Sequence, residues 1–166
     1  MVEKLNQSAS SAGRPAQILM IATYVVGFVG AFIGFGTVHG SAPSLNVAAI
    51  LAVFATGVLS FLRHAVWSRS DAVRGGWDYG VRNNFQIEVG LANLAWGVFA
   101  LLAVVLDWGL RVVAASFLIS GLYFAAVALF VIVIGDFKNR RVGGLIGIAV
   151  WAAIMIALGL TGMSAS

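Results

Sequence analysis

The sequence contains no cysteine and very little charge, and both absences narrow what the protein can be. Without cysteine it has no disulfides, no thiol catalysis and no thiolate metal ligands. Charged residues make up 10% of the chain, whereas soluble domains carry about 25%. Hydrophobic residues make up 61%, so too little polar surface remains to cover a water-soluble globule of this size. The composition therefore predicts a protein that is embedded in a lipid bilayer.

Five apolar stretches are each long enough to cross the hydrocarbon of a bilayer, which takes about 20 residues. Backbone groups in lipid must be hydrogen-bonded internally, and none of the stretches alternates as the strands of a barrel would, so we expect helices. We predict an all-α integral membrane bundle of five transmembrane helices. A disordered polar lead covers residues 1–16, and a single transmembrane domain covers residues 17–163. The expected spans are 17–36, 45–62, 87–106, 112–135 and 142–163, and residues 63–84 form an interfacial loop.

Positive charge lies almost entirely on one side of these spans. The N-terminal segment, the second loop and the fourth loop carry two, four and three of the ten Lys and Arg residues, and Arg111 in the third loop is the tenth. Lys and Arg favour the cytoplasmic side of a membrane. We therefore expect a cytoplasmic N-terminus and an outside C-terminus, in a multi-pass protein of the cell inner (plasma) membrane. The basic face would contact anionic headgroups, and no basic patch interleaved with aromatics suggests a nucleic-acid partner.

Several expected spans carry rows of small or polar residues, which favour close helix contact in lipid. The rows are Gly27, Gly30 and Gly34 in the first span, Gly90, Asn93 and Gly97 in the third, Ser116 and Ser120 in the fourth, and Gly143 and Gly147 in the fifth. Asn83 and Gln86 extend the third row toward the start of its helix, with the spacing of a capping box. Such a row either packs against another helix or lines a cavity.

Few residues in the spans could carry chemistry. Glu88, one turn inside the third span, is a functional candidate because ionisable groups in membranes are rare, although the helix dipole also stabilises an acid there. Asn93 lies deeper, at the depth of Tyr24 and Thr56, and these three could form an interhelical hydrogen-bond cluster. His39 and His64 lie on opposite sides of the membrane, which excludes a pair of haem ligands. We predict no metal site and no cofactor.

The second loop has features of a surface helix. Asp71 and Arg74 have the i, i+3 spacing of a helical ion pair. Trp67 and Trp77 suit the depth of the headgroups, where aromatic belts occur. This predicts a helical extension that lies along the cytoplasmic face and ends near Gly75.

One stretch resembles a known family. His64, a Gly76-Trp77 turn, Gly80 and the run Phe85-Gln86-Ile87-Glu88-Val89-Gly90-Leu91-Ala92-Asn93-Leu94 resemble a family of uncharacterised small bacterial polytopic membrane proteins. The resemblance implies that His64, Trp77, Gln86, Glu88 and Asn93 are the family's polar signature, and it implies no activity. Members also have a histidine-containing segment after the next helix, whereas residues 135–141 here contain no histidine.

We predict a protein that binds or passes a small solute or ion, with a ligand-binding site at the cytoplasmic end of the third helix. The expected site residues are Glu88, Asn93, Gln86, His64 and Trp77. The alternative is a non-catalytic accessory subunit of a larger membrane complex, or a homo-oligomer, because the chain is short for enclosing a cavity alone. An intramembrane enzyme would need a nucleophile and a base in contact, and the sequence shows no such pair, which favours a role without catalysis.

Overall fold

The computed structural model describes residues 12–75, 83–134 and 142–166, and it confirms an all-helical fold over them. Five helices are long and apolar enough to cross a membrane. They are α2 (Arg14–Thr37), a second long helix (Asn46–Val66), α6 (Asn84–Val105), α7 (Leu110–Ile134) and α8 (Val142–Ser164). A short helix, α5 (Ser68–Gly75), follows the second. The predicted N-terminal lead through Ser11 and the segments 76–82 and 135–141 lie outside the described residues.

The second long helix is built from four consecutive segments. Two of them, α3 (Asn46–Ala49) and α4 (Thr56–Phe61), are ordinary α-helix. The other two, η1 (Ile50–Ala55) and η2 (Leu62–Val66), are π-helix, whose turns are wider. Such turns are rare and occur often at functional sites. The helix therefore continues through residues 63–66, the first part of the predicted interfacial segment 63–84, and this brings Arg63 and His64 to the end that carries α5.

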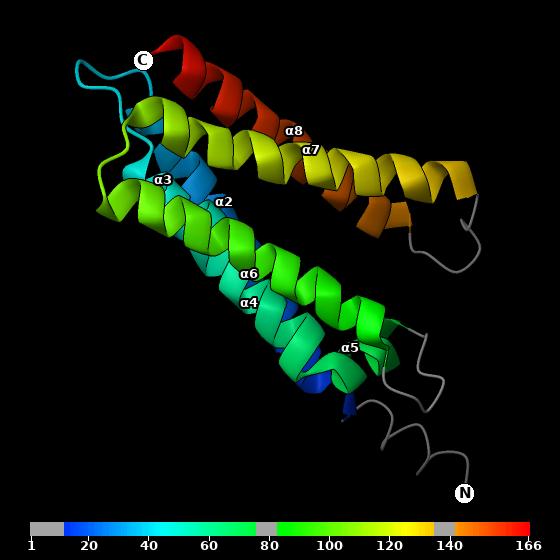
Figure 1. The fold of residues 1–166 in the computed structure, drawn as a ribbon. Coiled ribbons are helices and arrows are strands. Elements are labelled where there is room, and N and C mark those ends of the chain that lie inside the picture. The colour runs from blue at the N-terminus through cyan, green and yellow to red at the C-terminus, as the bar shows by residue number, and fades with distance from the viewer. Residues whose placement is uncertain (1–11, 76–82, 135–141) are drawn as a thin grey trace, which may run out of the picture.

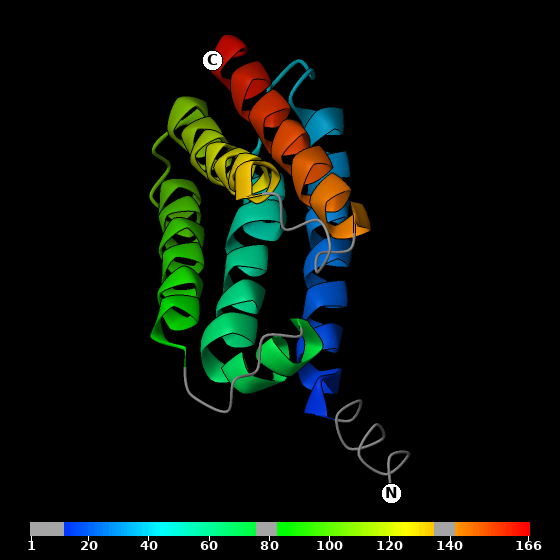
Figure 2. The ribbon, with the colours of Figure 1, turned by 90° about the vertical axis from the view of Figure 1, so that its right-hand side faces the viewer.

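The helices form two groups (Figures 1 and 2). In the first group, α2, the second helix and α6 lie side by side, with α5 across their lower end in Figure 2. In the second, α7 and α8 pair with each other, meet the first group near the C-terminus, and diverge from it toward the opposite end. The core sits where the groups meet, among Val38, Leu45, Ala103, Val113, Phe117 and Leu158. The end that carries α5 is consequently the open end of the molecule.

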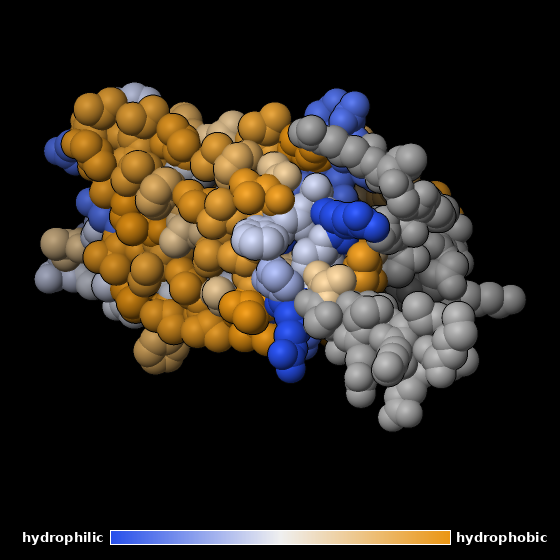
Figure 3. Space-filling model, turned by 90° about the horizontal axis from the view of Figure 1, so that it is seen from below, coloured by the Kyte–Doolittle hydropathy of each residue, from blue (hydrophilic) through white to orange (hydrophobic). Residues whose placement is uncertain are grey.

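The surface has the distribution of polarity that a bilayer requires. Figure 3 shows apolar side chains over a broad middle region, with hydrophilic side chains toward both ends of the molecule. Large apolar residues of the long helices are exposed, such as Phe32 at 83% and Val133 at 75%. In water such exposure would be costly, whereas in lipid tails it is not. The outward-facing apolar residues thus agree with five helices that sit in a membrane.

The predicted glycine rows of the first and third helices are packing surfaces. A Cβ atom at Gly30 would lie 2.7 Å from the backbone nitrogen of Ala52, and one at Gly97 would lie 3.1 Å from the carbonyl oxygen of Phe54. Both glycines therefore let α2 and α6 approach the backbone of η1 closely. The row predicted at the start of α8 differs, because nothing lies within 4 Å of a Cβ built at Gly143, Gly144 or Gly147.

We predict that Gly30→Ala destabilises the protein, because the added methyl group must push α2 away from a backbone atom that cannot move aside. Overpacking of this kind costs about 1–3 kcal/mol. Gly36→Ala on the same helix is the matched control, because its Cβ meets nothing within 4 Å. Thermal unfolding in detergent should give a lower midpoint for Gly30→Ala and an unchanged or slightly higher one for Gly36→Ala. Equal midpoints for the two variants would contradict the close contact.

Candidate functional site

A fully buried carboxylate, Asp71, lies at the open end of the bundle and gathers the polar side chains around it. Arg74, one turn further along α5, donates from Nη2 and Nε to Asp71 Oδ1 at 2.9 and 3.2 Å. This confirms the predicted i, i+3 pair. The side chain of Asp71 is 0% exposed, so its charge must be balanced by protein groups rather than by water.

The π-helical turn η2 supplies two more partners for this carboxylate. His64 Nδ1 lies 2.9 Å from Asp71 Oδ2, a short but bent contact, and Arg63 Nε lies 3.7 Å from Oδ1. Arg63 Nη2 also lies 2.7 Å from His64 Nε2. Because a guanidinium can only donate, Nε2 accepts and the ring hydrogen sits on Nδ1, facing the carboxylate.

The start of α6 completes the arrangement. Gln86 Nε2 donates to Asp71 Oδ2 at 3.0 Å and to the carbonyl oxygen of Ser68 at 3.1 Å. Asn83 caps the helix, its Oδ1 accepting from the backbone N–H of Gln86 at 3.4 Å. Half of the predicted capping box is therefore present, and the side chain of Gln86 binds α5 instead of turning back to Asn83. We call Arg63, His64, Asp71, Arg74 and Gln86 the Asp71 cluster.

The electrostatics of the cluster keep Asp71 ionised. Burial alone would raise the pKa of its carboxyl, but hydrogen bonding from His64 and the charge of Arg63, with a further hydrogen bond from Arg74, lower that pKa to about 2. A group whose pKa is lowered by folding stabilises the fold at pH values above its pKa in the unfolded state. This stabilisation is lost as the pH falls through the pKa of the folded state. Asp71 is thus ionised at physiological pH, and the stability that its lowered pKa contributes is lost as the pH falls from about 4 toward 2.

A small polar cavity lies deeper in the bundle, between α2, the second helix, α6, α7 and α8. Its volume accessible to water is about 30 Å³, which is enough for about two water molecules. Its polar lining residues are Thr23, Thr56, Ser60, Asn93 and Ser120, and its aromatic lining residues are Trp96, Phe124 and Trp151. We call this space the interhelical cavity.

Most polar groups of the cavity wall are also bonded to their own helix. Thr23 donates to the carbonyl oxygen of Leu19 at 2.7 Å, and Thr56 to that of Ala52 at 2.7 Å. Asn93 Nδ2 donates to the carbonyl oxygen of Val89 at 2.7 Å. The predicted cluster of Tyr24, Thr56 and Asn93 is therefore not formed as a bonded set. Thr56 and Asn93 share the cavity wall, whereas Tyr24 is exposed and is not among the lining residues.

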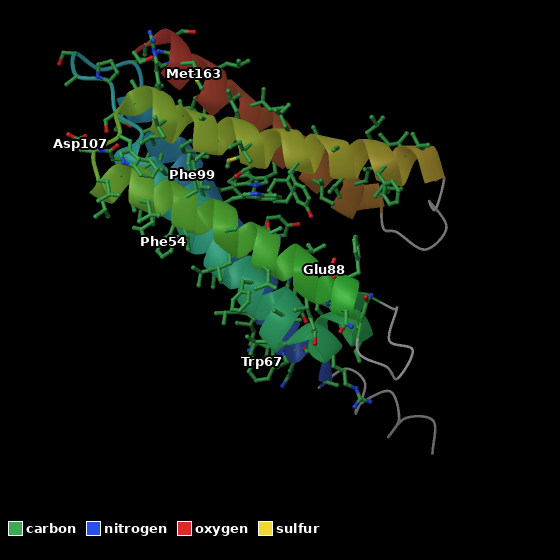
Figure 4. All side chains as sticks on the ribbon, in the orientation of Figure 1. Phe54, Trp67, Glu88, Phe99, Asp107 and Met163 are labelled. Atoms are coloured by element: carbon green, nitrogen blue, oxygen red, sulfur yellow. The ribbon has the colours of Figure 1, made fainter. Side chains whose placement is uncertain are left out.

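The five predicted site residues are divided between these two places. His64 and Gln86 meet at Asp71, and Asn93 lines the cavity. Glu88 is exposed and lies on the face of α6 opposite the buried row, toward α7 in Figure 4, so the structure does not bring it together with the others. Trp77 lies outside the described residues.

Sequence reasoning missed Asp71 as the centre of the site. It treated Asp71 as half of a surface ion pair, because the segment around it reads as a polar loop. The burial depends on η2 and α6 arriving at the same point, which no local pattern reveals. One signal was available: the cluster's residues all fall within 24 positions that also carry the family resemblance.

Comparison with known proteins supports a family but brings no activity. The sequence model of a protein family, described as "Family of unknown function (DUF6790)", matches residues 16–165. No curated protein and no solved structure matches the chain. Nearly all of the described bundle, including both the Asp71 cluster and the interhelical cavity, falls inside the matched residues.

We predict that Asp71→Asn strongly destabilises the protein, because it leaves Arg63 and Arg74 beside a neutral group in a buried site. Removing one member of a buried ion pair costs about 3–5 kcal/mol. Asp107→Asn is the matched control, since Asp107 is exposed at the opposite end of the molecule in Figure 4. The free energy of unfolding in detergent should fall for Asp71→Asn and stay within about 0.5 kcal/mol for Asp107→Asn. Similar stabilities for the two variants would show that the cluster is not structural.

Proposed function

We propose that this chain, which belongs to the DUF6790 family of unknown function, binds a small solute or ion within the bilayer and passes it across. The observation that carries this proposal is the interhelical cavity, whose polar lining comes from four of the five long helices. Polar groups inside a membrane are costly, and here those of four helices line one shared space, as the wall of a solute pathway does. The cavity's size restricts its content in this conformation to water-sized species.

A polar row connects the cavity with the Asp71 cluster and supports a pathway. Thr56, Ser60 and His64 follow one another at intervals of four along the second helix, so they lie on one face. Thr56 and Ser60 line the cavity, and His64 contacts Asp71. A solute that entered past the cluster would therefore meet hydroxyl groups at each turn of this helix, with the cluster acting as the closed end.

The charge distribution supports an orientation for this pathway. Arg63, Arg69 and Arg74 lie at the end that carries α5, and Arg14 begins α2 at the same end (Figure 1). The opposite end carries Arg111 beside the C-terminus, where it bonds Ser166. By the positive-inside rule the α5 end is cytoplasmic. The protein would thus lie in the inner (plasma) membrane with its C-terminus outside and its basic face against anionic headgroups.

We predict that Asn93→Leu reduces passage of small species, because it replaces a polar wall group by an apolar one of similar size. The measurement is flux in proteoliposomes, using osmotic shrinkage for water, urea and glycerol and a potential-sensitive dye for monovalent ions. Flux of the species that the wild type passes should fall at least tenfold. Ser116→Ala is the control, because Ser116 is buried on α7 but does not line the cavity. Wild-type protein that raises no flux above empty liposomes would remove the proposal.

A second candidate function is the accessory subunit, and the start of α8 favours it. Gly143, Gly144 and Gly147 have open space where their side chains would be, and Val142 and Ile146 beside them are exposed. Small residues let another membrane helix approach closely. A partner helix could therefore pack along this part of α8, at the end where α7 and α8 diverge from the other helices.

We predict for this second function that the protein co-purifies with a defined partner chain in mild detergent and that Gly147→Leu abolishes the association. Native mass spectrometry gives the composition of the complex. Gly36→Leu is the control, because Gly36 also has open space but lies on α2. A protein that is monomeric in both variants and in the wild type would rule the subunit function out.

A further inference from the structure

The interhelical cavity presents oxygens whose hydrogens are already engaged. The hydroxyl groups of Thr23 and Thr56 donate to carbonyl oxygens of their own helices, and Ser120 donates to the carbonyl oxygen of Ser116 at 2.9 Å. A backbone carbonyl can only accept, so the direction of these three bonds is certain. Each hydroxyl therefore has no hydrogen left for a guest and keeps its oxygen lone pairs. Toward a guest these three oxygens act as acceptors, which favours a guest that donates hydrogen bonds or carries positive charge.

Two further polar side chains, Asn93 and Ser60, line the same space. Asn93 uses Nδ2 to bond the carbonyl oxygen of Val89, which leaves Oδ1 as an acceptor. Ser60, which is 8% exposed, brings a fifth oxygen, and its hydroxyl group can also donate. The residues that line this space for about two waters thus carry five side-chain oxygens, whose lone pairs attract a cation.

Aromatic rings line the same space and strengthen the preference for positive charge. Trp96, Phe124 and Trp151 contribute to the wall, and the π-systems of such rings attract cations, tryptophan most strongly. Two of the rings are held by neighbours: Trp96 packs against Tyr123 with centroids 4.5 Å apart, and Trp151 against Phe28 at 5.4 Å. The rings are therefore fixed parts of the wall.

We propose that the interhelical cavity is a binding site for a small monovalent cation. This inference rests on the proposed function and names the class of its ligand. A divalent cation would require carboxylates, and none is among the lining residues. Neutral oxygens suffice for monovalent ions, as carbonyl rings in channels show. Ammonium fits best, because its four N–H groups donate to the hydroxyl oxygens and it also binds aromatic rings.

The Asp71 cluster limits how tightly the cation binds. Arg63, Arg74 and Asp71 sum to one positive charge, and Arg63 is about one helical turn from Ser60. This charge repels a cation in the cavity, so binding is weak and appears only at high salt concentration. The same repulsion keeps the site from holding the ion permanently, as passage requires.

The test is thermal unfolding of the purified full chain in detergent, followed by tryptophan fluorescence, with ammonium, sodium, potassium or choline chloride at equal ionic strength. Choline is the bulky reference that the cavity cannot admit. We expect ammonium, or the small ion that fits better, to raise the unfolding midpoint by about 2–4 °C over choline. Ser120→Ala should lose this rise and Ser116→Ala should keep it. These two serines are both buried on α7 and bonded to their own helix, and only Ser120 lines the cavity.

Equal midpoints in all four salts would overturn the inference and leave the cavity to water, as would a rise that Ser120→Ala retains. If Ser120→Ala does not fold, Thr23→Val removes another wall hydroxyl and serves in its place. The flux measurement separates this inference from the proposed function. Flux of water or urea that depends on Asn93, with no effect of any cation on the unfolding midpoint, would support the proposed function and contradict cation binding. A cation effect on the midpoint without measurable flux would support the binding site and contradict passage.

Discussion

The burial of the Asp71 carboxylate is the constraint on which the α5 end of this protein depends. An ionised group with 0% exposure is stable only when donors surround it, and here they come from η2, α5 and α6. The short helix α5 is too polar and too short to hold its place by apolar contact. Its position beneath the bundle therefore follows from the carboxylate, and so does the close approach of η2 to the start of α6, where a Cβ at Gly90 would lie 3.2 Å from His64 Cβ. A further hydrogen bond, from the backbone N–H of Ala16 to Ser70 Oγ at 3.2 Å, joins the start of α2 to α5.

The membrane interior imposes a different rule on the hydroxyl groups. With no water to bond, a serine or threonine in a span donates to its own helix, as Thr23, Thr56 and Ser120 do. In a packed interface this removes the hydroxyl from further use. Where several such groups border one space, these hydroxyl groups act as acceptors toward it. This part of the polarity of the interhelical cavity is thus a consequence of how each helix satisfies its hydroxyl groups locally, and it appears only when α2, the second helix and α7 bring Thr23, Thr56 and Ser120 together.

The sequence predicted the parts of this structure that depend on composition and local spacing. Five apolar helices, the Asp71–Arg74 pair, the Asn83 cap and the packing of the Gly30 and Gly97 rows all follow from short-range patterns. It did not predict the π-helical turns, because no residue pattern distinguishes them from α-helix. Without η2 the side chain of His64 could not be assigned to Asp71, so the predicted site joined Gln86 to Glu88 along α6. The structure instead places Glu88 on the exposed face of α6, opposite the buried row.

The two groups of helices meet around the core near the C-terminus and again beside the cavity, where Trp96 packs against Tyr123 and Phe28 against Trp151. The cavity lies where α7 and α8 begin to diverge from α6, with Ser120 and Phe124 on the α7 side and Asn93 and Trp96 on the α6 side. Passage of any solute larger than the cavity would require the α7–α8 pair to move relative to the other helices. A partner helix on the glycines of α8 would instead fix the pair and the size of the cavity with it. The two proposed functions therefore require opposite behaviour of the α7–α8 pair. The pair must move for passage by the lone chain, whereas a partner helix on α8 would hold the pair in place and so set the size of the cavity.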